Sequence, residues 1–117
     1  MSESNPPPLV LKNVAGITIA TITSPKLGPD IRNALYELFD KHAARKIILN
    51  FEDVQSLSSA PIGMLVNLRN KLHSAGGSLI LCRLSPDIRE ILQLTRVESF
   101  FSILDTEQDA IESLIAV

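Results

Sequence analysis

Two adjacent serines, Ser58 and Ser59, are the residues whose position in the sequence is most suggestive of chemistry. They lie in the stretch SLSSAPIG, residues 56–63, between the apolar run KIILNF and an apolar segment with helical spacing. Pro61 is expected in the first turn of that helix, which places both hydroxyls at its N-terminus, beside free backbone N–H groups and the positive end of the helix dipole. A serine there can cap the helix. Alternatively, one of the two hydroxyls has a functional role, which the rest of the chain must help to decide.

The other residue types that catalyse reactions or bind metals are sparse. The chain has only two histidines, His42 and His73, and both are expected near helix C-termini, where histidine more often interacts with the last carbonyls than with a metal. No third ligand is spaced to complete a site. The single cysteine, Cys82, lies in the apolar run SLILC and is expected to be a buried core residue rather than a reactive thiol.

Three further features favour structural roles. Glu52 and Asp53 follow an apolar strand and are expected to be solvated turn residues. Gly76 and Gly77 precede a strand, so they are predicted to end a helix rather than to bind phosphate. The sequence therefore predicts neither an enzyme nor a bound metal or cofactor.

Composition and charge exclude several kinds of partner. A net charge of −2 and an aromatic content of 4% supply neither the basic surface nor the stacking platforms that nucleic acids require. No apolar run approaches the roughly 20 residues of a membrane-spanning helix, and the N-terminus lacks a signal-peptide pattern. A cytoplasmic protein is the expectation.

The order of apolar patterns predicts one small α/β domain over residues 9–117, preceded by a flexible, proline-rich arm at residues 1–8. A mixed, mostly parallel sheet of about five strands with about four helices follows, because strands joined through single helices are parallel. The expected elements are a hairpin over 9–22 turning at 15–16, a helix over 29–42, a strand over 46–51, a helix ending before 76, a strand over 78–82, a helix from 86, a strand over 100–104 and a helix after Thr106.

The segment after Ser59 is apolar over an unusually wide arc. The expected core stripe is formed by Ile62, Leu65, Val66 and Leu72, and Met64 and Leu68 widen it. Two interpretations stay open: the helix is packed on both sides, or part of this surface meets a partner, for which methionine is well suited.

Residues 46–104, with the preceding hairpin and the closing segment DTEQDAIESL, resemble the STAS domain of anti-sigma factor antagonists over nearly the whole chain after Pro8. In that family the loop before the second helix usually reads Asp-Ser-Ser/Thr-Gly-Leu-Gly. Its first hydroxyl is phosphorylated by a kinase that is also an anti-sigma factor. Aligning the final glycine with Gly63 implies Ser59 as the phosphoacceptor, with Ser58 as the alternative.

The chain departs from the family pattern within this motif and at one position outside it. Ser58 replaces the aspartate and Pro61 replaces the first glycine. Arg96 stands where the family often has glycine, so a left-handed backbone there would carry a cost for a non-glycine residue.

The resemblance implies a partner-switching module that binds an anti-sigma factor with serine kinase activity, which supplies ATP and magnesium. The implied contact residues are Ser24, Lys26, Ser58, Ser59, Gly63, Met64, Asn67 and Arg83. Self-association into a weak homodimer is left open. One rival interpretation is an unphosphorylated scaffold subunit of a signalling assembly or transport system. The other, a small enzyme or nucleotide binder, lacks a base, a metal set and a glycine-rich loop.

Overall fold

A central sheet organises the structure, a computed structural model that describes residues 7–115. Within them the sheet has five strands in the order β1-β2-β3-β4-β5, with β1 antiparallel to β2 and the others parallel. The strands are β1 (Leu9–Val14), β2 (Ile17–Ile22), β3 (Lys46–Asn50), β4 (Ser78–Cys82) and β5 (Ser102–Leu104). The helices are α1 (Pro29–Asp40), α2 (Ser59–Ser74), α3 (Pro86–Leu94) and α4 (Glu107–Ile115), with a 3-10 turn at Glu98–Phe100. The predicted fold class is confirmed.

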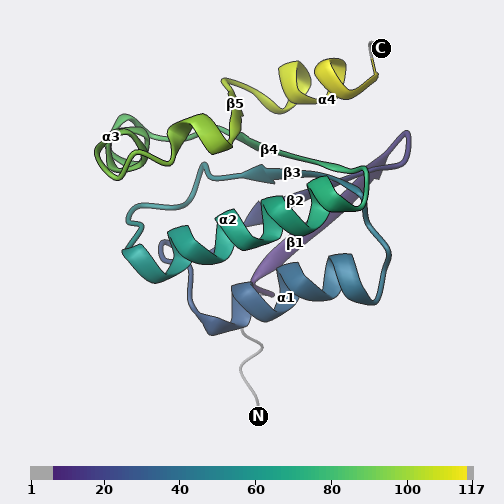
Figure 1. The fold of residues 1–117 in the computed structure, drawn as a ribbon, viewed down its shortest axis with the longest axis horizontal. Helices are drawn as coiled ribbons and strands as arrows, with labels where there is room; N and C mark the ends of the chain where they lie inside the picture. Colours follow the sequence, from purple (N-terminus) through teal and green to yellow (C-terminus); the bar gives the residue numbers. More distant parts are fainter. Residues whose placement is uncertain (1–6, 116–117) are drawn as a thin grey trace.

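The sheet is covered by helices on both faces (Figure 1). The larger core lies between the sheet and α1, α2 and α3, which are the helices that connect β2 to β3, β3 to β4 and β4 to β5. On the opposite face, α4 covers a smaller cluster that contains Ile17, Ile19, Ile48, Ile80 and Cys82. Burial raises the pKa of the Cys82 thiol to about 11, in accord with the predicted core role of this residue.

The strand pairing and the local turns explain why the chain folds this way. Ala15 and Gly16 form the two-residue hairpin turn, with φ of 53° and 81°, as a hairpin with matching strand twist requires. Ser85 caps α3 by accepting a hydrogen bond from the Ile88 N–H at 3.2 Å. Thr106 caps α4 in the predicted way, accepting from the Asp109 N–H at 3.0 Å.

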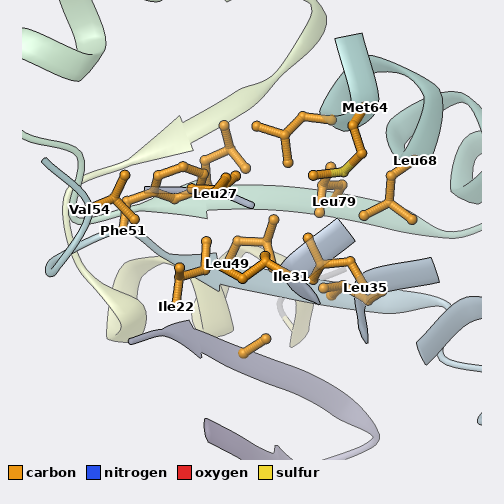
Figure 2. Close-up of a cluster of buried hydrophobic side chains, with 14 of the residues drawn as sticks. Ile22, Leu27, Ile31, Leu35, Leu49, Phe51, Val54, Met64, Leu68 and Leu79 are labelled. Atoms are coloured by element: carbon orange, nitrogen blue, oxygen red, sulfur yellow. The ribbon is translucent and has the colours of Figure 1, made fainter. Parts of the chain in front are cut away.

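Helix α2 is packed on both sides, which decides between the two interpretations of its wide apolar arc. Met64 and Leu68 are 6% and 0% exposed, and Figure 2 shows them near Leu79 of the sheet and Leu35 of α1. The arc is therefore wide because α2 packs against both the sheet and α1.

Two predicted element boundaries were wrong. Helix α1 ends at Asp40 rather than near His42, because Ala43 adopts a left-handed conformation (φ 55°) that reverses the chain. His42 is consequently exposed and does not belong to the apolar stripe of α1. The last strand begins at Ser102, since Phe100 belongs to the 3-10 turn and lies 45% exposed.

The segment before β1 is connected to the domain at Pro7 and Pro8. Thr23 donates to the Pro7 carbonyl through its hydroxyl at 2.6 Å and to the Pro8 carbonyl through its N–H at 3.2 Å. Residues 1–6 of the predicted arm lie outside the described residues, as do the last two of the chain.

Candidate functional site

The loop between β3 and α2, residues 51–58, is held to the core by three buried side chains. Phe51, Val54 and Leu57 are 1%, 2% and 6% exposed, and Figure 2 shows the first two beside Leu27 and Leu49. The Phe51 N–H also donates to the Cys82 carbonyl at 3.0 Å. The loop is thus fixed at its apolar positions while its polar residues face outward.

Ser58 and Ser59 are both exposed at the end of this loop. Ser58 occupies the N-cap position in extended conformation, but its hydroxyl makes no capping hydrogen bond, unlike those of Ser85 and Thr106. Ser59 is the first helical residue of α2, with Pro61 in the same turn as predicted. The capping interpretation therefore does not account for the Ser58 hydroxyl.

The electrostatics at this helix end favour an anion. The first turn of α2 contains no acidic residue, whereas Asp87 and Glu107 occupy the first turns of α3 and α4. Backbone N–H groups at a helix N-terminus carry partial positive charge, and a carboxylate there normally offsets it. At α2 this charge is left without a carboxylate in the first turn.

The loop after β2 lies against the loop that precedes α2. The Pro25 carbonyl accepts hydrogen bonds from the N–H groups of Gln55 and Ser56 at 2.8 and 3.2 Å. Ser24 accepts from the Lys26 N–H at 3.3 Å, which shapes the turn, and the Lys26 side chain is exposed. Two of the predicted contact residues thus flank the Ser58–Ser59 loop through Pro25.

The predicted contact residues on α2 differ in exposure. Gly63 and Asn67 are exposed and line a groove of about 540 Å³ between α1 and α2, which begins at Ala60. Met64, considered above as adaptable surface, is buried and contributes to this groove only as part of its lining.

Arg83 lies away from the groove, although its loop shares the carboxyl edge of the sheet. It borders a separate hollow with Asn50, Glu52 and Glu107 on the α4 side. Its backbone is left-handed (φ 58°), as is that of Arg96 (φ 61°), where the sequence raised that question. Glu52 and Asp53 are exposed, in agreement with the predicted turn.

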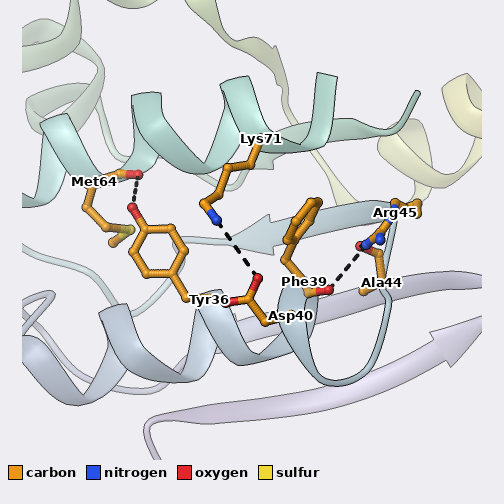
Figure 3. A network of polar contacts seen from close by, with 7 residues as sticks. All are labelled: Tyr36, Phe39, Asp40, Ala44, Arg45, Met64 and Lys71. Atoms are coloured by element: carbon orange, nitrogen blue, oxygen red, sulfur yellow. Dashed lines mark hydrogen bonds and ion pairs between the residues drawn. The ribbon is translucent and has the colours of Figure 1, made fainter. Parts of the chain in front are cut away.

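Residues of α1 complete the groove, and the sequence did not single them out. Arg32 and Tyr36 form its second wall, with the Arg32 guanidinium 5.3 Å from the centre of the Tyr36 ring. Figure 3 shows the Tyr36 hydroxyl directed at the Met64 carbonyl, which it approaches to 3.5 Å. Farther along the same two helices, Lys71 lies 3.9 Å from Asp40. The only available signal was that Arg32 and Tyr36 each follow a residue of the α1 core stripe, Ile31 and Leu35.

In residues 7–115 no group of three or more histidine, cysteine or acidic side chains is arranged to hold a metal ion. His42 and His73 are both exposed. No helix within the same range has the length and apolar character needed to cross a membrane.

The family model for the STAS domain matches residues 10–110. The chain is 29% identical to a provisionally assigned anti-sigma factor antagonist of Thermotoga maritima over 80 residues, covering 68% of this chain and 71% of that protein. The crystal structure of the Thermotoga protein superposes with a TM-score of 0.81 at 25% identity, over 92% of this chain and 94% of the other.

Similarity extends to the anti-sigma F factor antagonist of Paenibacillus polymyxa, with 21% identity over 87 residues and 74% of each chain. The unphosphorylated and phosphorylated structures of SpoIIAA from Bacillus share the fold at 22% identity, with TM-scores of 0.70 and 0.66. They cover 93% and 91% of this chain, and 99% and 98% of their own. Antagonists of this kind are regulators rather than enzymes. The chain belongs to the STAS domain family, in the group of anti-sigma factor antagonists.

Proposed function

We propose that this protein is a partner-switching module that binds a kinase-type anti-sigma factor through the surface around the N-terminus of α2. Phosphorylation of Ser59 by that partner regulates the interaction. The observation that carries the proposal is the exposed Ser59 hydroxyl in the first turn of a helix whose N-terminal charge no carboxylate of that turn offsets.

The transfer itself needs only a hydroxyl from this chain. Ser59 Oγ attacks the γ-phosphorus of ATP held with magnesium by the partner, and the bond to the β–γ bridging oxygen breaks. ADP leaves, and the hydroxyl proton passes to a base of the partner. Ser59 emerges as a phosphoserine with about −1.5 to −2 charge.

The added charge acts on the complex rather than on the fold. In the free protein the phosphate faces water and the positive end of α2, both of which favour it. In the complex it loses water and requires cationic contacts that the unmodified interface lacks. A loss of about 1.4 kcal/mol already weakens binding tenfold. Phosphorylation therefore releases the partner without a large conformational change.

Two similar proteins support this proposal. The Paenibacillus relative carries the name of an antagonist of an anti-sigma F factor, and SpoIIAA of Bacillus exists in a phosphorylated form. A second candidate function is a fixed scaffold of the same family without phosphorylation. The presence of Ser58 where the family motif has aspartate favours it.

Intact-mass analysis after incubation with ATP, magnesium and the kinase-type anti-sigma factor encoded nearest to this chain distinguishes the two. We expect an increase of one phosphate that is lost in Ser59→Ala and kept in Ser58→Ala. The reverse pattern would move the acceptor to Ser58. A stable complex without any modification would establish the scaffold instead.

A further inference from the structure

We propose that the docking surface for the partner extends onto α1 along the α1–α2 groove, where Arg32 and Tyr36 lie opposite the implied contact residues Gly63 and Asn67. It receives an apolar side chain that is flanked, on the partner, by an aspartate or glutamate. This inference rests on the proposed function, since it names the chemistry of the surface that the same partner presents.

Gly63 has no role in the folded chain that requires glycine. It lies in the second turn of α2 with ordinary helical geometry, and a Cβ atom built there would have no atom of residues 7–115 within 4 Å apart from the adjoining residues and backbone of its own helix. A glycine in a helix interior lowers stability relative to alanine, and a common reason to keep one is close approach of another molecule. By contrast, a Cβ on Gly77 would collide with the Arg45 carbonyl, so that glycine is explained by the fold itself.

The groove beside Gly63 has a mostly apolar lining and ample room for an apolar side chain of a partner. Buried Leu27 and Met64 contribute to its lining, together with Pro61 and Tyr36. Its volume of about 540 Å³ lies within the range of sites that enclose small ligands. Because the lining begins at Ala60, a partner bound over Ser59 reaches the groove without a break.

The positive charge of Arg32 at the rim of the groove favours an acidic residue on the partner. Arg32 is exposed and, within the described part of the chain, makes no ion pair, whereas Lys71 farther along the seam has Asp40 at 3.9 Å. The Arg32 guanidinium lies over the Tyr36 ring, which limits its orientations and leaves donors for a carboxylate. An apolar side chain beside a carboxylate therefore matches both features of the groove.

Titration calorimetry with the kinase-type partner tests whether the positive charge of Arg32 contributes to binding. We expect Arg32→Glu to weaken the affinity at least tenfold and to reduce its salt dependence. The matched control is Lys41→Glu, which makes the same change in net charge at the exposed end of α1 outside the groove, and we expect its affinity to stay within twofold of the wild type.

Gly63→Ala tests whether the partner closely approaches the backbone of α2, because the substitution is expected to affect stability and affinity in opposite directions. The melting temperature should rise, since alanine favours the helix and meets no neighbour, while the affinity for the partner should fall at least fivefold. Asn33→Ala, at an exposed α1 position that does not line the groove, should raise the melting temperature with no loss of affinity.

If Arg32→Glu and Gly63→Ala both bind like the wild type, the groove is not a docking surface, and the proposed function stands as long as Ser59 is phosphorylated. If the wild type neither binds the kinase nor is phosphorylated by it, both proposals fail.

Discussion

Asn50 Nδ2 donates a hydrogen bond of 2.6 Å to Glu107 Oε2 and thereby joins the end of β3 to the first turn of α4. Asn50 is 5% exposed, and its Oδ1 accepts from the Glu52 N–H at 2.8 Å. The other carboxylate oxygen of Glu107, Oε1, forms an ion pair with Lys12 Nζ at 3.2 Å. The buried Asn50 amide thus connects the first turn of α4 to the start of the loop that leads to Ser59. Glu107 extends this connection to Lys12 of β1.

Replacing this amide should destabilise the domain. Asn50→Ala leaves the Glu52 N–H and a Glu107 oxygen without their partners, and we expect the free energy of unfolding to fall by about 1–3 kcal/mol. Urea denaturation measures it. Asn33→Ala is the control, because Asn33 is an exposed residue within α1 where alanine favours the helix, and we expect no fall in the free energy of unfolding. Equal effects in the two variants would contradict the structural role of Asn50.

The same contacts predict how stability responds to acid. Hydrogen bonds from Asn50, followed by those from Lys12, hold the pKa of Glu107 below its ordinary 4.5, against the opposing effect of burial. The contribution of the ionised Glu107 carboxylate to the free energy of unfolding is therefore present above the ordinary pKa. It is lost as the pH falls through the lower pKa of Glu107 in the folded state.

Comparing the wild type with Glu107→Gln by urea denaturation at neutral pH and at about pH 3 tests this. We expect the wild type to be the more stable protein at neutral pH and the two to converge in acid. In an Asn50→Ala background the effect of Glu107→Gln on stability should change less with pH, since the main cause of the lowered pKa of Glu107 is gone. If the stability difference between the wild type and Glu107→Gln does not change with pH, the pKa of Glu107 is not lowered in the folded state.

The sequence was sufficient for the order of elements because that order depends on local patterns. The runs at Ile47–Leu49 and Leu79–Leu81 are apolar without alternation, as strands covered on both faces require, and they became β3 and β4. Pro86 and Gly76 marked a helix start and a helix end for steric reasons that no tertiary contact changes.

The composition of the site depended on tertiary packing and was predicted less well. Met64 is buried because α1 lies over it, and nothing in the sequence around Met64 specifies where α1 lies. Arg32 and Tyr36 belong to the groove for the same reason. Arg83, predicted to flank the surface around Ser59, borders a hollow with Asn50 and Glu107 on the α4 side of the sheet. Asn50 alone had a local signal, a polar residue at the end of an apolar strand, which requires a hydrogen-bond partner when buried.

Arg96 adopts a left-handed conformation where glycine would be relaxed. Because a non-glycine residue pays roughly 1–2 kcal/mol for this conformation, we expect Arg96→Gly to raise the free energy of unfolding by about 0.5–1 kcal/mol after the added flexibility of the unfolded chain is counted. Glu90→Gly, in the exposed interior of α3, should lower it by about 1 kcal/mol. Thermal unfolding of the three proteins is the measurement, and a loss in both variants would contradict the strain at Arg96.

Gly77 lies where the chain leaves α2 and enters β4, directly against the segment before β3. The Ser78 N–H donates to the Arg45 carbonyl at 2.8 Å, and a Cβ on Gly77 would overlap that carbonyl. Gly77→Ala must therefore separate two backbone segments, because a main-chain carbonyl cannot rotate away as a side chain does. We expect the free energy of unfolding to fall by about 1–3 kcal/mol, the range of an overpacked site. Gly63→Ala is the matched control, since the same added methyl group meets nothing there and should stabilise α2. Chemical denaturation of both variants should give changes of opposite sign, and a Gly77→Ala protein as stable as the wild type would mean that the approach of Arg45 to Gly77 is looser than the structure has it.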